Sequence, residues 1–409
     1  MFPRIKSAVA QYPRQFWLLT GVMMLAYFFH SLMWSFLLLY ISLHLGQPLS
    51  NVSWLMTLNA AVGVASSFLG GAIADRFGRK GVMIFSLLLA AFGWFFFRLA
   101  GSLPVYALLM VVTGATTPVY RLTADAMVAD LVPEEKRLDA YSLLRMGNNF
   151  GVAFGPAVGG FLVTVSYGLT FAIMGIGFAG IGILVAFLIR ETRSRSSNSS
   201  ITPAEEPASY AMILRDKIFL QVLVAYSLNR ICTSTLWMML AAYTKQNYGL
   251  SESHYGFIPT TNAIMVITMQ LFITRQVIRH KPSAAMAFGA LVYAVSIFCV
   301  AFGTGFWWFW LCMVGATIGE MILVPTTTTY TSRLAPPAMR ARYMSLYNLT
   351  WSIGSGLGPL LAGFSSDLFS PQAMWYTAGL TGFAAFLIFV KLAVQKPALM
   401  SPSARTGQA

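Results

Sequence analysis

The sequence predicts an all-α membrane protein with 12 transmembrane helices in two pseudo-symmetric six-helix bundles. The first observation behind this prediction is an internal repeat, in which the segment from Leu131 to Phe161 returns from Leu334 to Phe364, 203 residues later (334 minus 131) in a chain of 409. The second is the composition: 57% hydrophobic residues, 10% charged residues and a mean hydropathy of +0.68. Too few polar side chains remain to cover a water-soluble protein of this size, so we expect two diverged copies of one membrane bundle.

Each spanning helix requires about 20 apolar residues, and such stretches occur six times in each half. In order, they are residues 15–44, 50–74, 82–101, 103–131, 138–166, 168–190, 216–246, 252–275, 283–304, 305–333, 338–367 and 371–395. The first stretch is too long for a cleaved signal peptide and is expected to remain as the first helix. We predict an N-terminal bundle over 1–190, a cytoplasmic linker over 191–215, a C-terminal bundle over 216–396 and a cytoplasmic tail over 397–409, because the linker and tail are polar and low in complexity.

Basic residues lie at alternate helix ends. On one face they are Arg4, Lys6, Arg14, Arg76, Arg79, Lys80, Lys136, Arg137, Arg190, Arg193, Arg195, Arg275, Arg279, Lys281, Arg333, Arg340, Arg342, Lys391 and Lys396. Only Arg98 and Lys245 lie near the opposite face. By the positive-inside rule, both termini are expected to be cytoplasmic, in a multi-pass protein of the inner (cytoplasmic) membrane. The net charge of +14 therefore indicates topology, and its scatter over helix ends argues against a nucleic-acid partner.

No motif of a soluble catalytic site is present. The sequence lacks a GxxxxGK[ST] phosphate loop, an HExxH zinc motif and a CxxC pair. Its three cysteines, Cys232, Cys299 and Cys312, have no metal-ligand spacing and are interpreted as small core residues. We therefore predict no enzyme activity, no metal and no cofactor, and we expect a proton gradient to drive any uphill transport.

A loop rich in glycine and charge follows the second predicted helix. It reads Gly71-Ala-Ile-Ala-Asp75-Arg76-Phe-Gly78-Arg79-Lys80. Gly71 would let two helices approach closely, and Gly78 would permit a tight turn. As a bare pattern, this could be a generic cytoplasmic turn.

As G-x-x-x-D-R-x-G-R-K between helices two and three of a six-plus-six protein, however, this loop resembles the signature loop of the major facilitator superfamily. A second sequence, in the fifth predicted helix, is similar to the antiporter motif of that family; its members are Gly151, Gly155, Pro156, Gly159 and Gly160. The resemblance covers essentially the whole chain. It implies the fold of that family and a charge network that latches the inner gate, formed by Asp75, Arg76, Arg79, Lys80 and Asp130. The second motif implies drug and proton antiport, as in the LmrP-like multidrug efflux group.

The sequence departs from the family pattern at two places. Met110 stands where an arginine usually precedes Gly114 in the fourth helix, so a proton-relay role is not assigned there. The second copy of the signature loop, around Arg275 to Lys281, has lost its carboxylate.

Charged residues inside predicted helices are informative, because each costs about 2.5–3.5 kcal/mol at a helix centre on insertion scales and usually faces the bundle interior. Five are present: Arg121, Asp125, Arg145, Arg230 and Glu320. Glu320 is the first candidate for proton coupling, since a carboxylate in apolar surroundings can exchange a proton near neutral pH. The resemblance also implies this role, because LmrP-type transporters carry a glutamate at the matching position. The alternative is a structural partner for an arginine.

Asp125 is the second candidate for proton coupling. It lies one turn from Arg121, and the two could instead neutralise each other. Arg230 has no oppositely charged neighbour on its own helix and could pair with Glu320 or with an anionic substrate group. Arg145 could snorkel toward the cytoplasm.

The remaining candidates for the wall of a substrate cavity are aromatic or polar. With Arg121, Arg145 and Arg230, they are Tyr27, His30, Trp34, Asn59, Asn149 and Trp237. Tyr27, His30 and Trp34 are spaced by three and four residues, so they share one helix face. Aromatic side chains suit unrelated hydrophobic solutes. His30 could equally be a satisfied interior histidine.

These features predict a monomeric secondary active transporter that exports hydrophobic small molecules, including drugs, in exchange for protons by alternating access. The alternative is a carrier of organic anions, sugars or other metabolites, because positive charges outnumber negative ones within the membrane. A membrane receptor or scaffold would leave these charges without a purpose.

Overall fold

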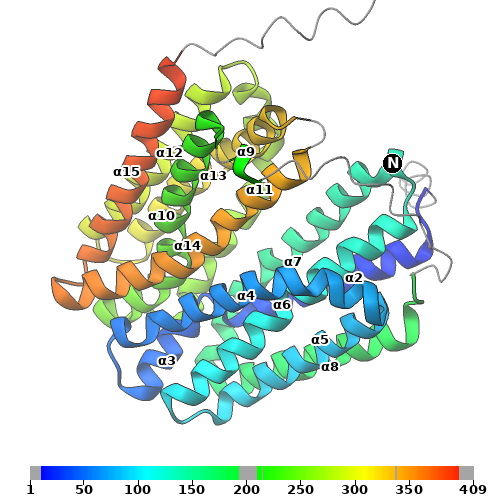
Figure 1. Cartoon of the computed structure of the whole chain (residues 1–409). Coiled ribbons are helices and arrows are strands. Elements are labelled where there is room, and N and C mark those ends of the chain that lie inside the picture. The colour runs from blue at the N-terminus through cyan, green and yellow to red at the C-terminus, as the bar shows by residue number, and fades with distance from the viewer. Residues whose placement is uncertain (1–10, 193–209, 214, 337–338, 396–409) are drawn as a thin grey trace, which may run out of the picture.

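The chain is built of α-helices in the computed structural model, which describes residues 11–192, 210–213, 215–336 and 339–395 (Figure 1). No strand occurs in these ranges, and the predicted all-α fold class is confirmed. The N-terminal half contains α2 (Arg14–Trp34), α3 (Leu37–Leu45), α4 (Leu49–Phe77), α5 (Arg79–Phe96), α6 (Leu103–Leu131), α7 (Arg137–Val165) and α8 (Tyr167–Leu188). The C-terminal half contains α10 (Lys217–Tyr248), α11 (Glu252–Val277), α12 (Pro282–Cys299), α13 (Phe306–Leu334), α14 (Arg340–Leu368) and α15 (Ala373–Val394).

The helix ends follow local sequence signals. The side chains of Ser166, Asp216 and Ser251 accept hydrogen bonds from backbone N–H groups in the first turns of α8, α10 and α11, which would otherwise lack partners. At the other end, α3 and α10 stop at Gly46 and Gly249, whose φ angles of 61° and 64° are left-handed and favour glycine.

The first predicted helix, 15–44, is divided in the structure. It consists of α2 and α3, joined through Ser35 and Phe36, where the N–H of Phe36 donates to the carbonyl of Met33 at 2.9 Å. This bond to the third preceding residue is tighter than an α-helical turn and bends the segment. Residues Arg14–Leu45 still read as one membrane span.

Ten segments of the described chain are long and apolar enough to cross a membrane. The helices α10 and α14 are of similar length but carry more polar side chains, including Arg230 and Asn348. They pack within the C-terminal bundle, α10 against α14 and α15. Their polar residues therefore lie in a bundle whose other four long helices are apolar enough to span a membrane.

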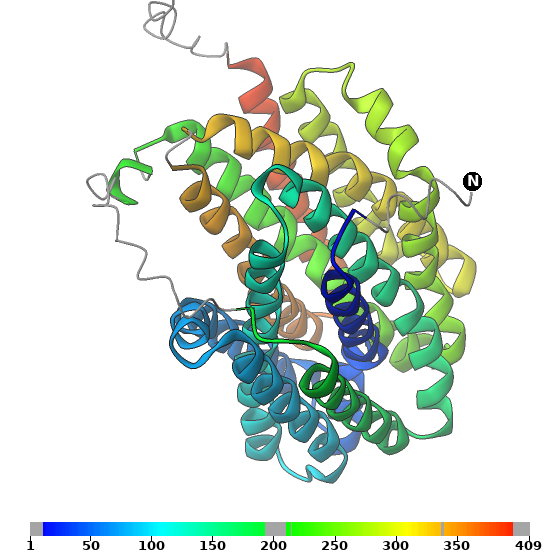
Figure 2. The same ribbon diagram turned by 90° about the vertical axis from the view of Figure 1, so that its right-hand side faces the viewer.

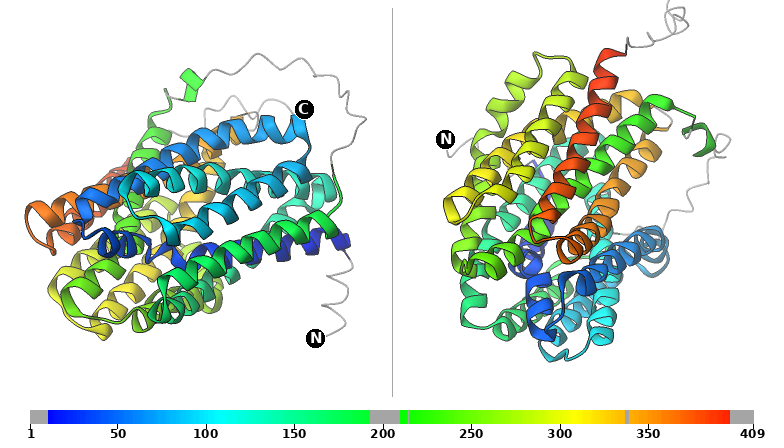
Figure 3. Two further views of the ribbon diagram at one scale, coloured as in Figure 1. Left: turned by 90° about the horizontal axis from the view of Figure 1, so that it is seen from below. Right: turned by 90° about the vertical axis from the view of Figure 1, so that its left-hand side faces the viewer.

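Two large helix contacts join the halves, α4 with α14 and α7 with α11, which are equivalent under the internal repeat; α3 also contacts α10. Figure 2 shows the blue-to-cyan helices of the first half below the orange and red helices of the second, and Figure 3 shows α14 beside α4 from two further directions. We call the end with Arg14, Arg79 and Arg340 the basic end.

We call the other end of the molecule the closed end, because the halves are bonded together there. The hydrogen bonds that cross between them among the described residues include Ser50 N–H to Asp367 at 2.7 Å, Thr57 to the carbonyl of Gly356 at 2.6 Å, Tyr167 to Glu252 at 3.0 Å, and Gln246 to Ser42 at 3.3 Å. Toward the basic end the ribbons of the two halves diverge (Figure 1). Asp125, Arg145 and Asn149 are exposed on that side, as expected for charges that face water rather than lipid.

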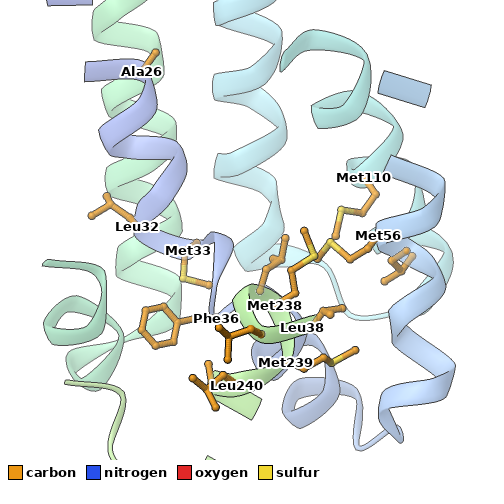
Figure 4. Close-up of a cluster of buried hydrophobic side chains, with 14 of the residues drawn as sticks. Ala26, Leu32, Met33, Phe36, Leu38, Met56, Met110, Met238, Met239 and Leu240 are labelled. Atoms are coloured by element: carbon orange, nitrogen blue, oxygen red, sulfur yellow. The ribbon is translucent and has the colours of Figure 1, made fainter. Parts of the chain in front are cut away.

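A methionine-rich plug fills the core near the closed end. Figure 4 shows Met33, Met56 and Met110 of the first half in the same buried cluster as Met238 and Met239 of the second. Flexible thioether side chains can repack when neighbours move. The contact between the halves is therefore made of adaptable groups.

The segment between the halves has more structure than a wholly polar linker. The short helix α9 (Tyr210–Ile213) brings Ile213 into a small buried cluster with Phe219, Ala335, Met339 and Tyr343. Glu191 and Thr192 contact the first half, as described below. The remaining linker residues, 193–209 and 214, and the tail from 396 onward lie outside the described residues.

Candidate functional site

The centre of the C-terminal half holds Glu320. This residue lies in the middle of α13 and is half-buried. Its Oε2 accepts a hydrogen bond of 2.8 Å from the amide of Asn262 on α11, and the same amide reaches the Thr317 hydroxyl at 3.0 Å. Tyr293 of α12, which is buried, interacts with both Glu320 and Arg230. Three helices thus surround this carboxylate with neutral hydrogen-bonding groups.

Arg230 lies close to Glu320 but does not pair with it directly. Ion pairs among the described residues include Asp75–Arg79, Arg79–Asp130 and Lys245–Glu252. Arg230 and Glu320 are not within ion-pair distance of each other, so the predicted pair is not formed. The two charges interact only through space. Arg230 donates instead to the Tyr226 hydroxyl and lies over the rings of Tyr226 and Trp351, 4.7 and 4.4 Å from their centres.

In the N-terminal half, Arg121 and Asp125 do not form the expected ion pair. The guanidinium of Arg121 lies 4.3 Å from the centre of the Tyr27 ring, an arrangement that stabilises a cation by the ring's negative face. Asp125 is exposed, and its backbone carbonyl accepts a 2.9 Å hydrogen bond from Tyr141. Arg121 and Asp125 still interact through space. Neutralisation of one by the other is therefore weaker than predicted.

On the predicted aromatic face of the first helix, His30 and Trp34 contact each other, whereas Tyr27 contacts Arg121. The ring of His30 stacks on Trp34 with centroids 4.8 Å apart and meets Trp94 edge-on at 5.7 Å. Its Nδ1 atom is buried and has no hydrogen-bond partner among the described residues. His30 is thus an interior histidine, but not a satisfied one. Trp237, half-buried in α10, occupies the position equivalent to Trp34 (34 plus 203).

Asn59 is engaged in packing between α4 and α6. Its amide donates to the carbonyl of Met110 at 2.9 Å and to the Thr113 hydroxyl at 3.1 Å. Arg145 and Asn149, both exposed on α7, lie nearer the basic end. The structure therefore does not gather all the predicted cavity residues into one cluster.

The signature loop forms a charge cluster at the basic end. Arg79 bridges Asp75, at 3.7 Å, and Asp130, and its Nη1 also donates to the carbonyl of Ala126 at 2.6 Å. Gly78 has a φ of 93°, and a Cβ there would lie 2.9 Å from a carboxylate oxygen of Glu191. Gly71 does not mediate the close helix approach predicted for it, because no atom lies within 4 Å of a Cβ built on it; its neighbour Gly70 faces Val119 instead.

Glu191 is a member of this cluster that the sequence did not reveal. Its carboxylate accepts from the backbone N–H groups of Arg79 at 3.2 Å and Lys80 at 3.0 Å, and so caps the start of α5. Thr192 then donates to Asp130 at 2.8 Å. The described bonds of this cluster lie within the N-terminal half and its adjoining linker.

The glycine-proline motif of α7 is a packing surface with two sides. Carbon atoms added at Gly151, Gly155 or Gly159 would collide with α2, whereas one added at Gly160 would lie 2.5 Å from the carbonyl oxygen of Glu252 in the other half. The first three glycines set the α2–α7 distance. Gly160 belongs to the contact between the halves at the closed end.

Several residues of the central cluster were missed by sequence reasoning, namely Tyr226, Asn262, Tyr293, Thr317, Trp351 and Tyr347, whose ring stacks on that of Tyr226. The repeat could have identified one of them, because Asn262 is the equivalent of Asn59 (59 plus 203). The others are uncharged, and uncharged residues of these types are frequent throughout the chain.

The chain resembles known transporters along its whole length. The model of the Major Facilitator Superfamily matches residues 19–228 and 222–408. The Na(+), Li(+), K(+)/H(+) antiporter of Planococcus maritimus is 26% identical over 395 residues, 88% of each chain. The quinolone resistance protein NorA of Staphylococcus aureus (strain MSSA476) is 23% identical over 350 residues, 84% of this chain and 88% of its own. The uncharacterized MFS-type transporter YqjV of Bacillus subtilis (strain 168) is 25% identical over 340 residues, 82% of each.

Solved structures have the same fold. The nucleoside transporter NupG superposes with a TM-score of 0.79 at 13% identity, covering 94% of this chain and all of its own. A bacterial homologue of the human lysosomal transporter Spinster gives a TM-score of 0.75 at 16% identity, covering 92% and 94%.

Proposed function

The chain belongs to the major facilitator superfamily of transporters, and we propose that it exports hydrophobic small molecules in exchange for protons by alternating access. The names of two relatives support the proposal: one is a Na(+), Li(+), K(+)/H(+) antiporter and the other is a quinolone resistance protein. Because these relatives are only 26% and 23% identical, the substrate and the coupled ion are inferred from the residues of this chain.

The observation that carries the proposal is the environment of Glu320. A carboxylate held by the amide of Asn262 and by Tyr293, with no cation within ion-pair distance among the described residues, can change protonation without breaking an ion pair. Neutral donors also adapt readily to the protonated form. We therefore infer that Glu320 binds and releases the coupled proton, with Asp125 as the second candidate.

The arrangement of the halves supports an inward-open state in this mechanism. If the basic end is cytoplasmic, as the positive-inside rule indicates, substrate enters between the diverging halves while the closed end excludes the outside. Rocking of the bundles would then expose the site outward. A proton moving inward through 100 mV supplies about 2.3 kcal/mol, enough for a modest gradient of a neutral compound. We place the monomeric protein in the cytoplasmic membrane, with both termini inside and no cofactor.

Proton movement in proteoliposomes tests this function. With an imposed pH gradient and a pH-sensitive dye, we expect substrates to dissipate the gradient in the wild type but not in Glu320→Gln. The matched control is Glu135→Gln, which alters an exposed glutamate in the loop after α6. Full proton-coupled export by Glu320→Gln would contradict the proposal.

A second candidate is a carrier of organic anions, sugars or other metabolites. It is favoured by one observation: Arg121 and Arg230 stack on aromatic rings and have no carboxylate within ion-pair distance in the described part of the chain. Dissipation of the gradient by anions alone would support this candidate over export of lipophilic cations.

A further inference from the structure

Arg230 is held in place from two sides. A Cβ added to Gly354 of α14 would lie 2.5 Å from the Arg230 Cβ, so the two helices touch at this level. On its own helix, one turn toward the basic end, Tyr226 is buried and accepts a hydrogen bond from the guanidinium. These contacts hold the guanidinium in one position, unlike the guanidinium of an arginine that has no such contacts.

This guanidinium has unused binding capacity. Arginine has five N–H donors, and the hydrogen bonds of the described residues include one from Arg230, to Tyr226. Its Nε is buried without a partner within the described chain. Glu320, the carboxylate that interacts with Arg230 through space, is bonded to Asn262 and also interacts with Tyr293. An unneutralised cation in the membrane interior favours an anionic ligand.

Trp351 covers one side of this cation and is itself open. The residue is 61% exposed although the guanidinium lies 4.4 Å from the ring centre. Trp351 shares its side of α14 with Asn348 and Ser355, which lie three and four residues away. The opposite side carries Leu357, Leu361 and Phe364, which are exposed and suited to lipid. The polar side with Trp351 is therefore distinct from the apolar side suited to lipid, and its indole is accessible to a ligand.

We propose that Arg230 and Trp351 form a binding subsite for aromatic carboxylates. The carboxylate would accept hydrogen bonds from the free donors of the guanidinium, and the aromatic ring would stack on the exposed indole. Tyr226 and the contact at Gly354 position the arginine. The proposal deepens the transport function proposed above, on which it rests for the assumption that the bound molecule is the cargo.

Calorimetric binding to the purified full chain in detergent tests the subsite with three probes. They are 2-naphthoate, its neutral amide 2-naphthamide, and adamantane-1-carboxylate, an aliphatic acid with the same number of carbon atoms. We expect 2-naphthoate to bind about tenfold or more tightly than either of the others, because only it provides both the charge and the flat ring. Equal binding of the amide, equal binding of the aliphatic acid, or no binding of 2-naphthoate would each overturn the proposal.

Variants identify the residues involved. Arg230→Gln should weaken 2-naphthoate about tenfold or more, and Arg230→Lys should retain part of the affinity. Trp351→Ala should weaken 2-naphthoate far more than adamantane-1-carboxylate, a selectivity change that general misfolding would not produce. The matched controls are Arg98→Gln, which alters a guanidinium 4.6 Å from the Phe95 ring near the closed end, and Trp307→Phe, which alters another exposed indole. Unchanged binding in Arg230→Gln, or equal loss in Arg98→Gln, would overturn the assignment.

The transport assay separates this proposal from the function on which it rests. If 2-naphthoate binds through Arg230 but moves no protons in proteoliposomes, the subsite stands and proton coupling fails. If tetraphenylphosphonium dissipates the pH gradient while 2-naphthoate does not bind, proton-coupled export stands and the subsite fails.

Discussion

Asn59 and Asn262 occupy equivalent positions in the two halves of the chain, and each donates hydrogen bonds from its amide to a neighbouring helix. Asn59 joins α4 to α6 through Met110 and Thr113, and Asn262 joins α11 to α13 through Thr317 and Glu320. Both halves of the repeat therefore retain an asparagine that bonds two helices together. In the second half this asparagine also bonds Glu320, the carboxylate for which we propose proton coupling.

Replacing Asn262 should reduce both the stability of the protein and its proton-coupled transport. Asn262→Ala removes the amide bonds to Glu320 and Thr317, and we expect about 1–3 kcal/mol of lost stability because buried partners remain unsatisfied. Proton-coupled transport should fall about tenfold beyond any loss of folded protein, since the carboxylate loses its donor. Thermal unfolding in detergent and the proteoliposome assay measure the two effects. The control is Asn247→Ala, whose amide donates to a carbonyl of its own helix at 2.9 Å; an equal transport loss there would contradict the prediction.

Two glycines three residues apart should respond oppositely to alanine. Gly78→Ala places a Cβ at a φ of 93° and 2.9 Å from Glu191, so we expect a loss of about 1–3 kcal/mol in stability. Gly81 lies in the first turn of α5 with no atom within 4 Å of an added Cβ. Gly81→Ala should therefore be neutral or stabilising by up to about 1 kcal/mol. Thermal unfolding of both variants provides the comparison, and a stable Gly78→Ala protein would contradict the account of the loop.

The sequence predicts the helices better than their side-chain partners. Long apolar runs specify membrane helices because the bilayer requires them, and the repeat confirms their pairing in two halves. The sequence does not predict that Arg121 stacks on the ring of Tyr27 and does not pair with Asp125, because helical spacing identifies neighbours on the same helix only. Glu191 illustrates the same limit, because a carboxylate in a polar linker gives no sign that it will cap α5. Partners contributed by other helices follow from packing, which one sequence does not reveal.

The closed end should weaken when Gly160 gains a methyl group. The added Cβ would lie 2.5 Å from the carbonyl oxygen of Glu252, so Gly160→Ala forces α7 and α11 apart. We expect a larger population of molecules that are open at this end. Spin labels on Asn51→Cys and Phe369→Cys, exposed residues of opposite halves, would report longer distances in a background that lacks the three native cysteines. Gly180→Ala in α8, where an added Cβ meets nothing within 4 Å, should leave the distances unchanged.

The hydroxyl of Tyr167 should affect the same equilibrium, between molecules that are closed and molecules that are open at the closed end. Tyr167 of the first half donates to Glu252 at 3.0 Å, and the other carboxylate oxygen of Glu252 pairs with Lys245 at 3.0 Å within the second half. Tyr167→Phe removes the bond between the halves and leaves the ion pair intact. A loss of about 1 kcal/mol would raise the population open at the closed end about fivefold.

The same pair of spin labels measures this shift, and Tyr243→Phe is the matched control because its hydroxyl bonds to Tyr248 within the C-terminal half at 3.0 Å. Glu252→Ala removes the acceptor of the same bond between the halves. Its population open at the closed end should therefore be at least as large as that of Tyr167→Phe, and both should exceed that of the wild type. A Tyr167→Phe protein with the wild-type distance distribution would show that the bond does not hold the closed end.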